Sequence, residues 1–352
     1  MAISRVISRQ SINEAEEGFN VSLRPKHLRE CVGQQKVIDK LKIAIEAAKR
    51  RNEPLEHILF YGPPGLGKTT LANVVANEMD ANIRCTSGPA LTKQGDLMGL
   101  LSNIGTGEVL FIDEVHRLST PVEEFLYPAM EEFRVDFTVD SGLHAKTINF
   151  PLKRFTLIGA TTRAGLLSAP LRGRFGMLYH LDFYSPDELT AIIKRSAGLL
   201  QLRCADGTLE LIASRSRGTP RIANRLLKRV RDYAQVKGTG VLNTEIVENA
   251  LKMEQIDPLG LDELDRAFLR ALANVYDGGP AGIDALAATL GEERDTLEDV
   301  VEPYLLQKGF VRRTKRGREI TKVACQHLNL KLPRKTPALP ADESANQPEL
   351  FQ

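Results

Sequence analysis

The sequence predicts an α/β nucleotide-binding domain over residues 1–184, a small all-α domain over residues 185–256 and a winged-helix domain over residues 257–332. Three observations favour this fold class. In the first segment, apolar runs of strand length alternate with helical patterns; the second has helical periodicity throughout; the third has three short amphipathic helices and then a basic hairpin. The last stretch, residues 333–352, is polar and contains prolines, which predicts a disordered tail.

A glycine-rich motif precedes the first long helical pattern of the α/β domain. "GPPGLGKTTLA" (62–72) follows the apolar run "HILFYG" (57–62) and leads into helical spacing, a strand-to-helix context that is typical of a P-loop. Its glycines let backbone amides turn toward phosphate oxygens, and the N-terminus of the helix adds partial positive charge. We expect Lys68 to reach the β- and γ-phosphates of ATP, Thr69 to bind Mg²⁺ and Thr70 to support the α-phosphate.

Three further strand-like runs follow the P-loop: "NIRCTS" (82–87), "EVLFIDE" (108–114) and "FTLIGATT" (155–162). Apolar strands that alternate with helices predict a parallel sheet covered on both faces. The stretch 133–150 differs because apolar and polar residues alternate on both sides of Ser141-Gly142, which predicts a β-hairpin.

Polar residues stand at the ends of two of these strands. Asp113 and Glu114 follow four apolar residues, and the carboxyl ends of parallel strands meet at the crevice where ligands bind. We expect Asp113 to hold Mg²⁺ through water and Glu114 to orient the attacking water. Thr161 and Thr162 end the next strand, where they are candidates for sensing the γ-phosphate.

Two further segments place arginines downstream of that strand. "PLRGRFG" (170–176) carries two arginines in a constrained loop, and Arg221 follows Pro220 at the start of a helical pattern. An arginine that reaches the transferring phosphoryl group, often from a neighbouring subunit, raises the rate by about 10³ to 10⁵. We expect the loop to supply such an arginine and Arg221 to bind phosphate from the all-α domain.

Both ends of the all-α domain are recognisable in the sequence. "SPDEL" predicts a capped helix N-terminus at Ser185, and the proline and glycine of "IDPLGLDEL" (256–264) predict a domain boundary.

The net charge of the chain is only +2. Residues 310–335 carry five Arg and four Lys against one Glu, a local charge of +8, around a hairpin that Gly317 is expected to close. The cluster predicts contact with nucleic-acid phosphates.

Composition excludes several other classes. The four cysteines (Cys31, Cys85, Cys204 and Cys325) lie far apart, so neither a zinc site nor a disulfide framework is indicated. No apolar run reaches membrane-spanning length, and the first ten residues lack the core of a signal peptide. We therefore expect a cytoplasmic protein.

The order of these features resembles the AAA+ ATPases. From Leu23 to about Gln326 the sequence is similar to one of their families, the RuvB branch-migration motors. The motifs that carry this similarity are "GPPGLGKTTLA", "FIDEVHRL", "TLIGATTRAGLLSAPLR", "GTPRIANRLL" and "GEERDTLEDVVEPYLLQKGF". The resemblance implies an ATPase that pulls duplex DNA through a homohexameric ring and so drives branch migration of Holliday junctions in recombination, repair and the SOS response. It also implies loading by RuvA and action upstream of resolution by RuvC.

The resemblance assigns roles to particular residues of this sequence. It implies catalytic roles for Lys68, Asp113, Glu114 and Arg174, the last acting in trans, and DNA contacts by Arg294, Arg313 and Arg318. The hairpin at 133–150 would dock RuvA. The implied ATP-binding residues are Leu23, Arg24, Gly65, Lys68, Thr69, Thr70, Glu131, Glu132, Phe133, Thr161, Arg174, Tyr184 and Arg221, with Mg²⁺ held by Thr69 and, through water, by Asp113.

Two other functions stay open from the residues alone. Replication initiators of the AAA+ class also join an ATPase core to a winged helix, but they recognise a sequence and act as nucleotide-gated switches. Clamp-loader-like assembly proteins share the core and normally lack a DNA-reading winged helix. In a motor, ATP hydrolysis moves the DNA strands, whereas in an initiator-like switch it only ends a DNA-bound state.

Overall fold

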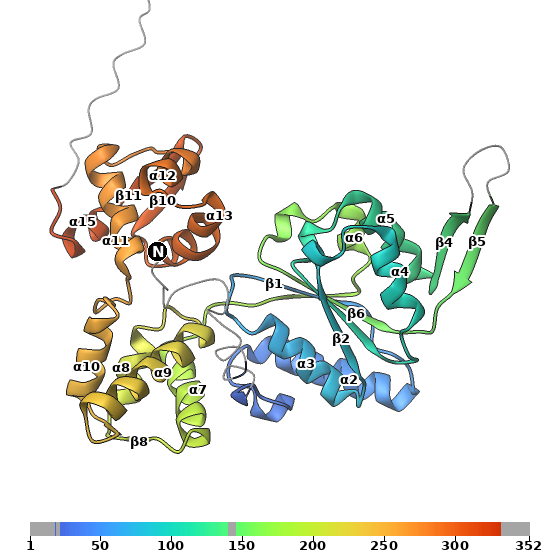
Figure 1. The fold of residues 1–352 in the computed structure, drawn as a ribbon, viewed down its shortest axis with the longest axis horizontal. Coiled ribbons are helices and arrows are strands. Elements are labelled where there is room, and N and C mark those ends of the chain that lie inside the picture. Colours follow the sequence, from blue (N-terminus) through green and yellow to red (C-terminus); the bar gives the residue numbers. More distant parts are fainter. Residues whose placement is uncertain (1–17, 19–21, 140–145, 332–352) are drawn as a thin grey trace, which may run out of the picture. The chain divides into compact units, whose positions relative to one another are not determined.

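The computed structural model describes residues 18, 22–139 and 146–331 and divides into two compact units, residues 1–263 and 264–352 (Figure 1). The predicted turn at Ser141-Gly142 and the predicted tail at 333–352 lie outside the described residues. Within the described residues, no helix is long and apolar enough to cross a membrane.

A five-stranded parallel sheet forms the centre of the α/β domain, with the strand order β2-β3-β6-β1-β7. Four of its strands coincide with the predicted runs, which confirms those predictions: β1 (Ile58–Tyr61), β2 (Ile83–Ser87), β3 (Val109–Asp113) and β6 (Thr156–Thr161). The fifth, β7 (Met177–His180), was not predicted. It is a four-residue edge strand in which only Tyr179 is buried, so it lacks a continuous apolar run.

The two faces of the sheet belong to two separate apolar cores. Because side chains alternate along a strand, Ile58 and Phe60 of β1 enter one core and Leu59 enters the other. The first core is completed by α2 (Gln35–Arg51) and α3 (Lys68–Glu78). The second is completed largely by α4 (Gln94–Ser102), α5 (Thr120–Glu131) and the short α6 (Ala169–Gly173). The two pairs of longer helices lie on opposite sides of the sheet (Figure 1).

Short elements connect the sheet to its helices. The predicted hairpin is confirmed over the described residues, because β4 (Arg134–Val139) pairs antiparallel with β5 (Lys146–Pro151). Phe133 precedes it with a φ of 52° and packs against Phe155 and His57. The single-turn helices of this domain are η1 (Leu28–Glu30), η2 (Gly88–Ala90), η3 (Val115–Arg117) and η4 (Ala164–Leu166).

Four helices build the small domain: α7 (Pro186–Leu199), α8 (Thr208–Ser214), α9 (Pro220–Lys237) and α10 (Thr244–Met253). The predicted cap is confirmed: the Glu188 amide donates to Ser185 Oγ at 3.2 Å, and the Ser185 amide donates to the Glu188 carboxylate at 2.8 Å. The prediction of helix throughout is wrong at two points. Strand β8 (Arg203–Cys204) pairs parallel with β9 (Val241–Leu242), and two residues are too few to show a strand periodicity.

The second unit has the expected outline of a winged helix. Three helical segments precede the wing: α11 (Glu263–Arg270) with η5 (Ala271–Val275), α12 (Ile283–Leu290), and α13 (Arg294–Thr296), which continues through η6 (Leu297–Val301) into α14 (Glu302–Gln307). The wing is the antiparallel pair β10 (Val311–Thr314) and β11 (Gly317–Ile320), and α15 (Lys322–His327) follows.

The role expected for Gly317 is corrected by the structure. The wing turns at Lys315 and Arg316, and Gly317 is already the first residue of β11. Its φ is 143°, and a Cβ there would lie 2.3 Å from the carbonyl oxygen of Ala281. Ala281 bridges to Arg318, so glycine is required by the close approach of a third chain segment.

Candidate nucleotide site and nucleic-acid interface

The P-loop connects β1 to α3 in a backbone conformation that its glycines allow. Gly62, Gly65 and Gly67 have φ values of 138°, 81° and 97°, which disfavour residues that carry a Cβ. At Gly62 a Cβ would also lie 2.4 Å from the carbonyl oxygen of Leu181. The loop ends at the N-terminus of the 11-residue helix α3, where free amides and the helix dipole favour an anion.

Lys68 is buried within this loop. The residue is only 7% exposed, and Nζ donates to the carbonyl oxygens of Gly62 at 2.7 Å and Pro63 at 2.8 Å. These bonds hold the ammonium group against the loop backbone. A phosphate bound by the loop amides would lie within reach of the same ammonium.

A cleft of about 650 Å³ opens beside the P-loop. It brings together eight of the predicted site residues: Arg24, Gly65, Lys68, Thr69, Thr70, Asp113, Glu114 and Arg221. The hydroxyl of Thr69 and the carboxylate of Asp113 are hard oxygen donors of the kind Mg²⁺ prefers, and Mg²⁺ retains several waters, so two protein ligands are enough. The residues of the cleft therefore fit ATP with Mg²⁺.

A smaller pocket of about 100 Å³ adjoins the cleft, since Arg24, Gly67 and Thr70 line both. Its lining is mostly apolar and includes the predicted residues Leu23 and Tyr184. Such a lining suits the flat, aromatic base of a nucleotide. Burial raises the pKa of Tyr184, so its hydroxyl stays protonated and donates to the Leu66 carbonyl at 3.2 Å. Burial likewise raises the pKa of Cys31, which lines the pocket, to about 11 and keeps it a neutral thiol.

The two carboxylates at the end of β3 differ in their contacts. Asp113 accepts a hydrogen bond from the Glu114 amide at 2.9 Å. Glu114 has φ 50° and ψ 44°, a left-handed conformation that costs a non-glycine residue about 1 to 3 kcal/mol. Its Oε2 accepts from Arg117 at 3.1 Å. This conformation places Glu114 in the lining of the cleft, together with Arg117, which the sequence analysis did not identify.

The prediction that Thr161 contacts the nucleotide is not supported by its position. Thr161 is fully buried; its hydroxyl lies 2.9 Å from Nδ1 of His116 and accepts from the Arg163 amide at 3.0 Å. Thr162 lines the cleft instead, and its buried hydroxyl has no hydrogen-bond partner among the described residues. A buried hydroxyl without a partner is costly unless a ligand satisfies it, so Thr162 is the better candidate for the γ-phosphate.

The small helical domain reaches the P-loop through the start of α9. The Arg221 amide donates to the Gly65 carbonyl at 3.4 Å, and a Cβ at Gly65 would lie 3.3 Å from Cβ of Arg221. Asn224, one helical turn later, lines both cavities and was not predicted. Its spacing of three residues from Arg221 on a helix was the available signal.

Arg195 of α7 is a third residue that was not predicted from the sequence. Its NH1 donates to the Leu23 carbonyl at 2.7 Å, and its NH2 donates to Glu30 at 2.9 Å. These bonds fix the segment that lines the smaller pocket to the helical domain. No pattern in the sequence distinguishes Arg195 from an ordinary helix-surface arginine.

Besides Thr161, four predicted ATP-binding residues line neither the cleft nor the smaller pocket of their own chain: Glu131, Glu132, Phe133 and Arg174. Arg174 donates from NH2 to Glu131 at 3.1 Å and from NH1 to the Pro170 carbonyl at 2.9 Å. Its guanidinium carbon lies 4.1 Å from the centre of the Tyr127 ring. None of the four therefore lies in the nucleotide cleft of its own chain.

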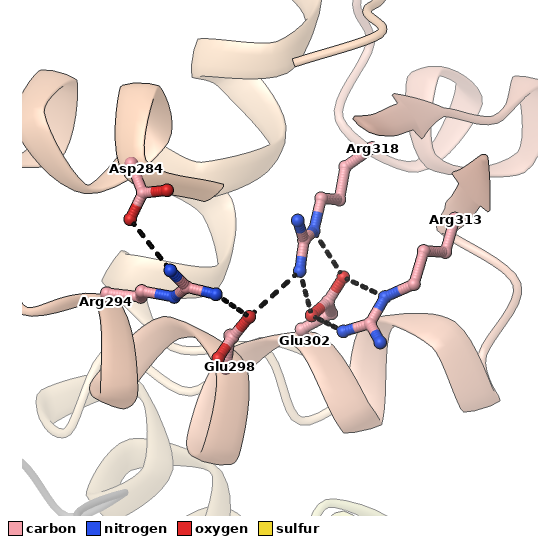
Figure 2. Close-up of polar contacts among 6 residues, drawn as sticks. All are labelled: Asp284, Arg294, Glu298, Glu302, Arg313 and Arg318. Atoms are coloured by element: carbon pink, nitrogen blue, oxygen red, sulfur yellow. Dashed lines mark hydrogen bonds and ion pairs between the residues drawn. The ribbon is translucent and has the colours of Figure 1, made fainter. Parts of the chain in front are cut away.

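The three predicted DNA-contacting arginines lie together in one ionic network of the winged helix (Figure 2). Arg294 pairs with Asp284 at 3.4 Å and with Glu298 at 3.3 Å. Arg318 pairs with Glu298 and Glu302, and Arg313 pairs with Glu302. The side chains of Arg294 and Arg313 are each 55% exposed, whereas that of Arg318 is 12% exposed. The first two are therefore the accessible members.

Three family models match nearly all of the chain from residue 23 to residue 329. The model of the "Holliday junction DNA helicase RuvB P-loop domain" matches residues 23–181. Those of the "RuvB AAA lid domain" and the "RuvB C-terminal winged helix domain" match residues 184–257 and 258–329. A curated relative from Kosmotoga olearia, the "Holliday junction branch migration complex subunit RuvB", is 57% identical over 315 residues, covering 90% of this chain and 92% of its own length.

Solved structures agree with the sequence comparison. The Thermotoga maritima RuvB Holliday junction branch migration motor superposes with a TM-score of 0.82 at 52% identity, covering 89% of this chain and 100% of its own. A mutant of the same Thermotoga protein gives a TM-score of 0.83 at 52% identity, covering 88% and 100%. Since the three family models follow one another along the chain and the relatives match over nearly its full length, the protein belongs to the RuvB family of AAA+ ATPases.

Proposed function

We propose that this protein couples ATP hydrolysis to the movement of duplex DNA and so drives branch migration of Holliday junctions during recombination and repair. The observation that carries the proposal is the cleft, which gathers a P-loop lysine, two strand-end carboxylates and an arginine from the helical domain. It is supported by the winged helix, whose arginine network would contact phosphates without reading bases.

The cleft residues supply the parts that phosphoryl transfer requires. With Mg²⁺ bound, the metal neutralises charge on the phosphates. Lys68 and the P-loop amides hold the β- and γ-phosphates, and Thr69 and Asp113 provide the metal ligands. Glu114 orients the attacking water, while Thr162 and Arg221 hold the γ-phosphate from the sheet and from α9. Because α9 belongs to the helical domain, loss of the γ-phosphate would change how that domain sits on the P-loop.

We further propose that the active form is a homohexameric ring in which Arg174 acts on the ATP of a neighbouring copy. In its own chain Arg174 rests on Tyr127 and Glu131 rather than in the cleft. A head-to-tail interface that closes into a ring would repeat the same contact at every subunit.

Mixing two inactive variants is expected to restore part of the ATPase activity. Arg174→Ala keeps an intact P-loop and Lys68→Ala keeps an intact Arg174, so each is inactive alone. In a random equal mixture about a quarter of the interfaces of a head-to-tail ring combine both intact parts. Phosphate release measured across mixing ratios tests this. Absence of any recovery, with co-assembly confirmed by light scattering, would place Arg174 within its own active site.

Removing the two accessible arginines of the winged helix is expected to weaken the salt dependence of DNA binding. Each neutralised phosphate contributes about 0.9 to the magnitude of the log–log salt slope, so Arg294→Ala with Arg313→Ala lowers it by about 1.8 per winged helix engaged. The affinity loss should be similar on unrelated duplexes. Arg50→Ala with Arg51→Ala, two exposed arginines of α2, is the charge-matched control. An unchanged slope, or a loss confined to one sequence, would favour the initiator-like switch.

We propose RuvA as the partner that loads the ring, through the hairpin β4–β5, and RuvC as the enzyme that resolves the junction afterwards. The function as a whole is tested with purified protein, a synthetic four-way junction and ATP, with and without RuvA, on a strand-separation gel. Separation that needs ATP hydrolysis supports a motor. Junction binding that changes with nucleotide but never separates strands would show a binding switch.

A further inference from the structure

The ionic network of the winged helix is organised around one buried carboxylate. Glu302 is the first residue of α14, and its side chain is 0% exposed. Its Oε1 accepts from Nε of Arg318 at 2.7 Å and from Nε of Arg313 at 3.2 Å. Its Oε2 accepts from NH2 of Arg318 at 3.1 Å and from NH2 of Arg313. Both guanidinium groups therefore bind the same carboxylate through two N–H groups each (Figure 2).

Glu302 offsets the repulsion between these two arginines of the wing. Arg313 and Arg318 are directly opposite in the register of β10 and β11, so their side chains share one face of the hairpin. Like charges in this position destabilise a strand pair. Burial alone would raise the pKa of Glu302, but the hydrogen bonds from Arg318 and Arg313 outweigh it and hold the pKa below its ordinary value. Glu302 is thus charged and bridges the two cations.

The same contacts leave one side of each guanidinium unused. The hydrogen bonds of Arg313 and Arg318 to Glu302 engage Nε and NH2, and NH1 of either arginine has no protein partner within the described residues. A guanidinium fixed by a bidentate pair loses little further entropy when its remaining N–H groups bind a second anion. Glu302 therefore presents the arginines in a fixed orientation.

We propose that Glu302 is a positioning residue for DNA binding, which holds Arg313 and Arg318 side by side so that they engage the phosphate backbone as one unit. The inference rests on the proposed DNA-binding role of the winged helix. Arg313, the more exposed of the two, makes the principal phosphate contact. Arg318, at 12% exposure and held also by Glu298 at 3.4 Å, fixes the carboxylate from the other side.

A positioning role and a simple charge effect predict opposite results. The network contains three arginines and three carboxylates (Asp284, Glu298 and Glu302), so its formal charge is zero. If only net charge mattered, removal of the Glu302 charge would strengthen binding to a polyanion. If position matters, the same change weakens binding although it makes the protein more positive.

The test measures binding of the full-length protein to a labelled duplex of mixed sequence by fluorescence anisotropy, over a range of salt concentrations. Glu302→Gln is expected to weaken binding roughly tenfold, because the freed guanidiniums lose their fixed orientation. Glu319→Gln is the matched control: it removes the same charge from the opposite face of the same hairpin, where Glu319 pairs with Arg312 at 2.8 Å. The control should bind as well as the wild type or better.

A second variant keeps the inference testable even where Glu302→Gln unfolds the winged helix. Arg313→Lys retains the positive charge at a half-exposed position but cannot form the two-point contact with Glu302. It is expected to bind DNA as weakly as Arg313→Ala. Thermal unfolding and ATPase activity without DNA verify that each variant is folded.

The outcomes separate this inference from the proposed function. Wild-type affinity of Arg313→Lys, or unchanged or tighter binding by folded Glu302→Gln, overturns the positioning role. If in the same series Arg313→Ala still weakens binding and lowers the salt slope, the DNA-binding role of the winged helix survives. If Arg313→Ala changes neither, the DNA interface lies elsewhere and both proposals fail.

Discussion

Replacing Lys68 by alanine is expected to abolish ATP hydrolysis while the α/β domain stays folded. Lys68 is 7% exposed and its ammonium group donates to two carbonyl oxygens of the loop, so it is held beside the loop amides that would bind the phosphates. Loss of one fixed charge or donor at a transferring group costs about 10² to 10³ in rate. The loop conformation itself depends on glycines rather than on Lys68, so the fold should persist.

Phosphate release and nucleotide binding by calorimetry measure this effect, with circular dichroism as the check on folding. Lys49→Ala removes the same charge from α2, where Lys49 is half-exposed and paired with Asp80 at 3.0 Å, and should leave turnover unchanged. Hydrolysis by Lys68→Ala near the wild-type rate would remove Lys68 from the catalytic machinery and leave the cleft without its main phosphate ligand.

The parts of the fold that were predictable are those determined by local sequence. Strands β1, β3 and β6 were found because each is a mostly apolar run between helical patterns, and β2 was found as a strand-like run at the expected place in the same alternation. Strand β7 was missed because what defines it as a strand is its pairing with β1. The paired residues lie more than a hundred positions apart in the sequence. The wing was found from its two short runs, but the need for glycine at 317 depends on Ala281, which no local pattern relates to it.

The sequence could not distinguish the two threonines at the end of β6, for a physical reason. All six residues of this strand are buried, so its sequence carries no alternation to show which side chains face the cleft. In a strand, a shift of one residue moves a side chain to the opposite face. Thr161 and Thr162 were therefore indistinguishable in the sequence, and only the structure separates the hydroxyl bound to His116 from the one in the cleft.

The charge of the winged helix was misjudged for a similar reason. Residues 310–335 carry a local charge of +8, but the fold brings two carboxylates from outside that range, Glu298 and Glu302, to the arginines. A charge count along the chain omits such partners. It located the cluster of arginines and gave no indication that they are already paired.

Replacing Glu114 by glutamine is expected to leave ATP binding intact and to slow hydrolysis by about 10² or more, the usual contribution of a general base. Glutamine has the same shape and can occupy the left-handed backbone position at Glu114, but its amide cannot take a proton from water. Arg117, which donates to Glu114 at 3.1 Å, can still donate to the amide oxygen, so the local geometry should survive.

The physical signature of this variant is a separation of binding from chemistry. An interaction needed only in the transition state lowers the rate of the chemical step without weakening the ground-state complex. The variant should therefore bind ATP with wild-type affinity by calorimetry and show little phosphate release in a single-turnover assay. Glu124→Gln, an exposed carboxylate of α5 in the same domain, should behave as the wild type. Loss of ATP binding by Glu114→Gln would instead make Glu114 a ligand of the nucleotide or its metal, and the water-orienting role would pass to another group of the cleft.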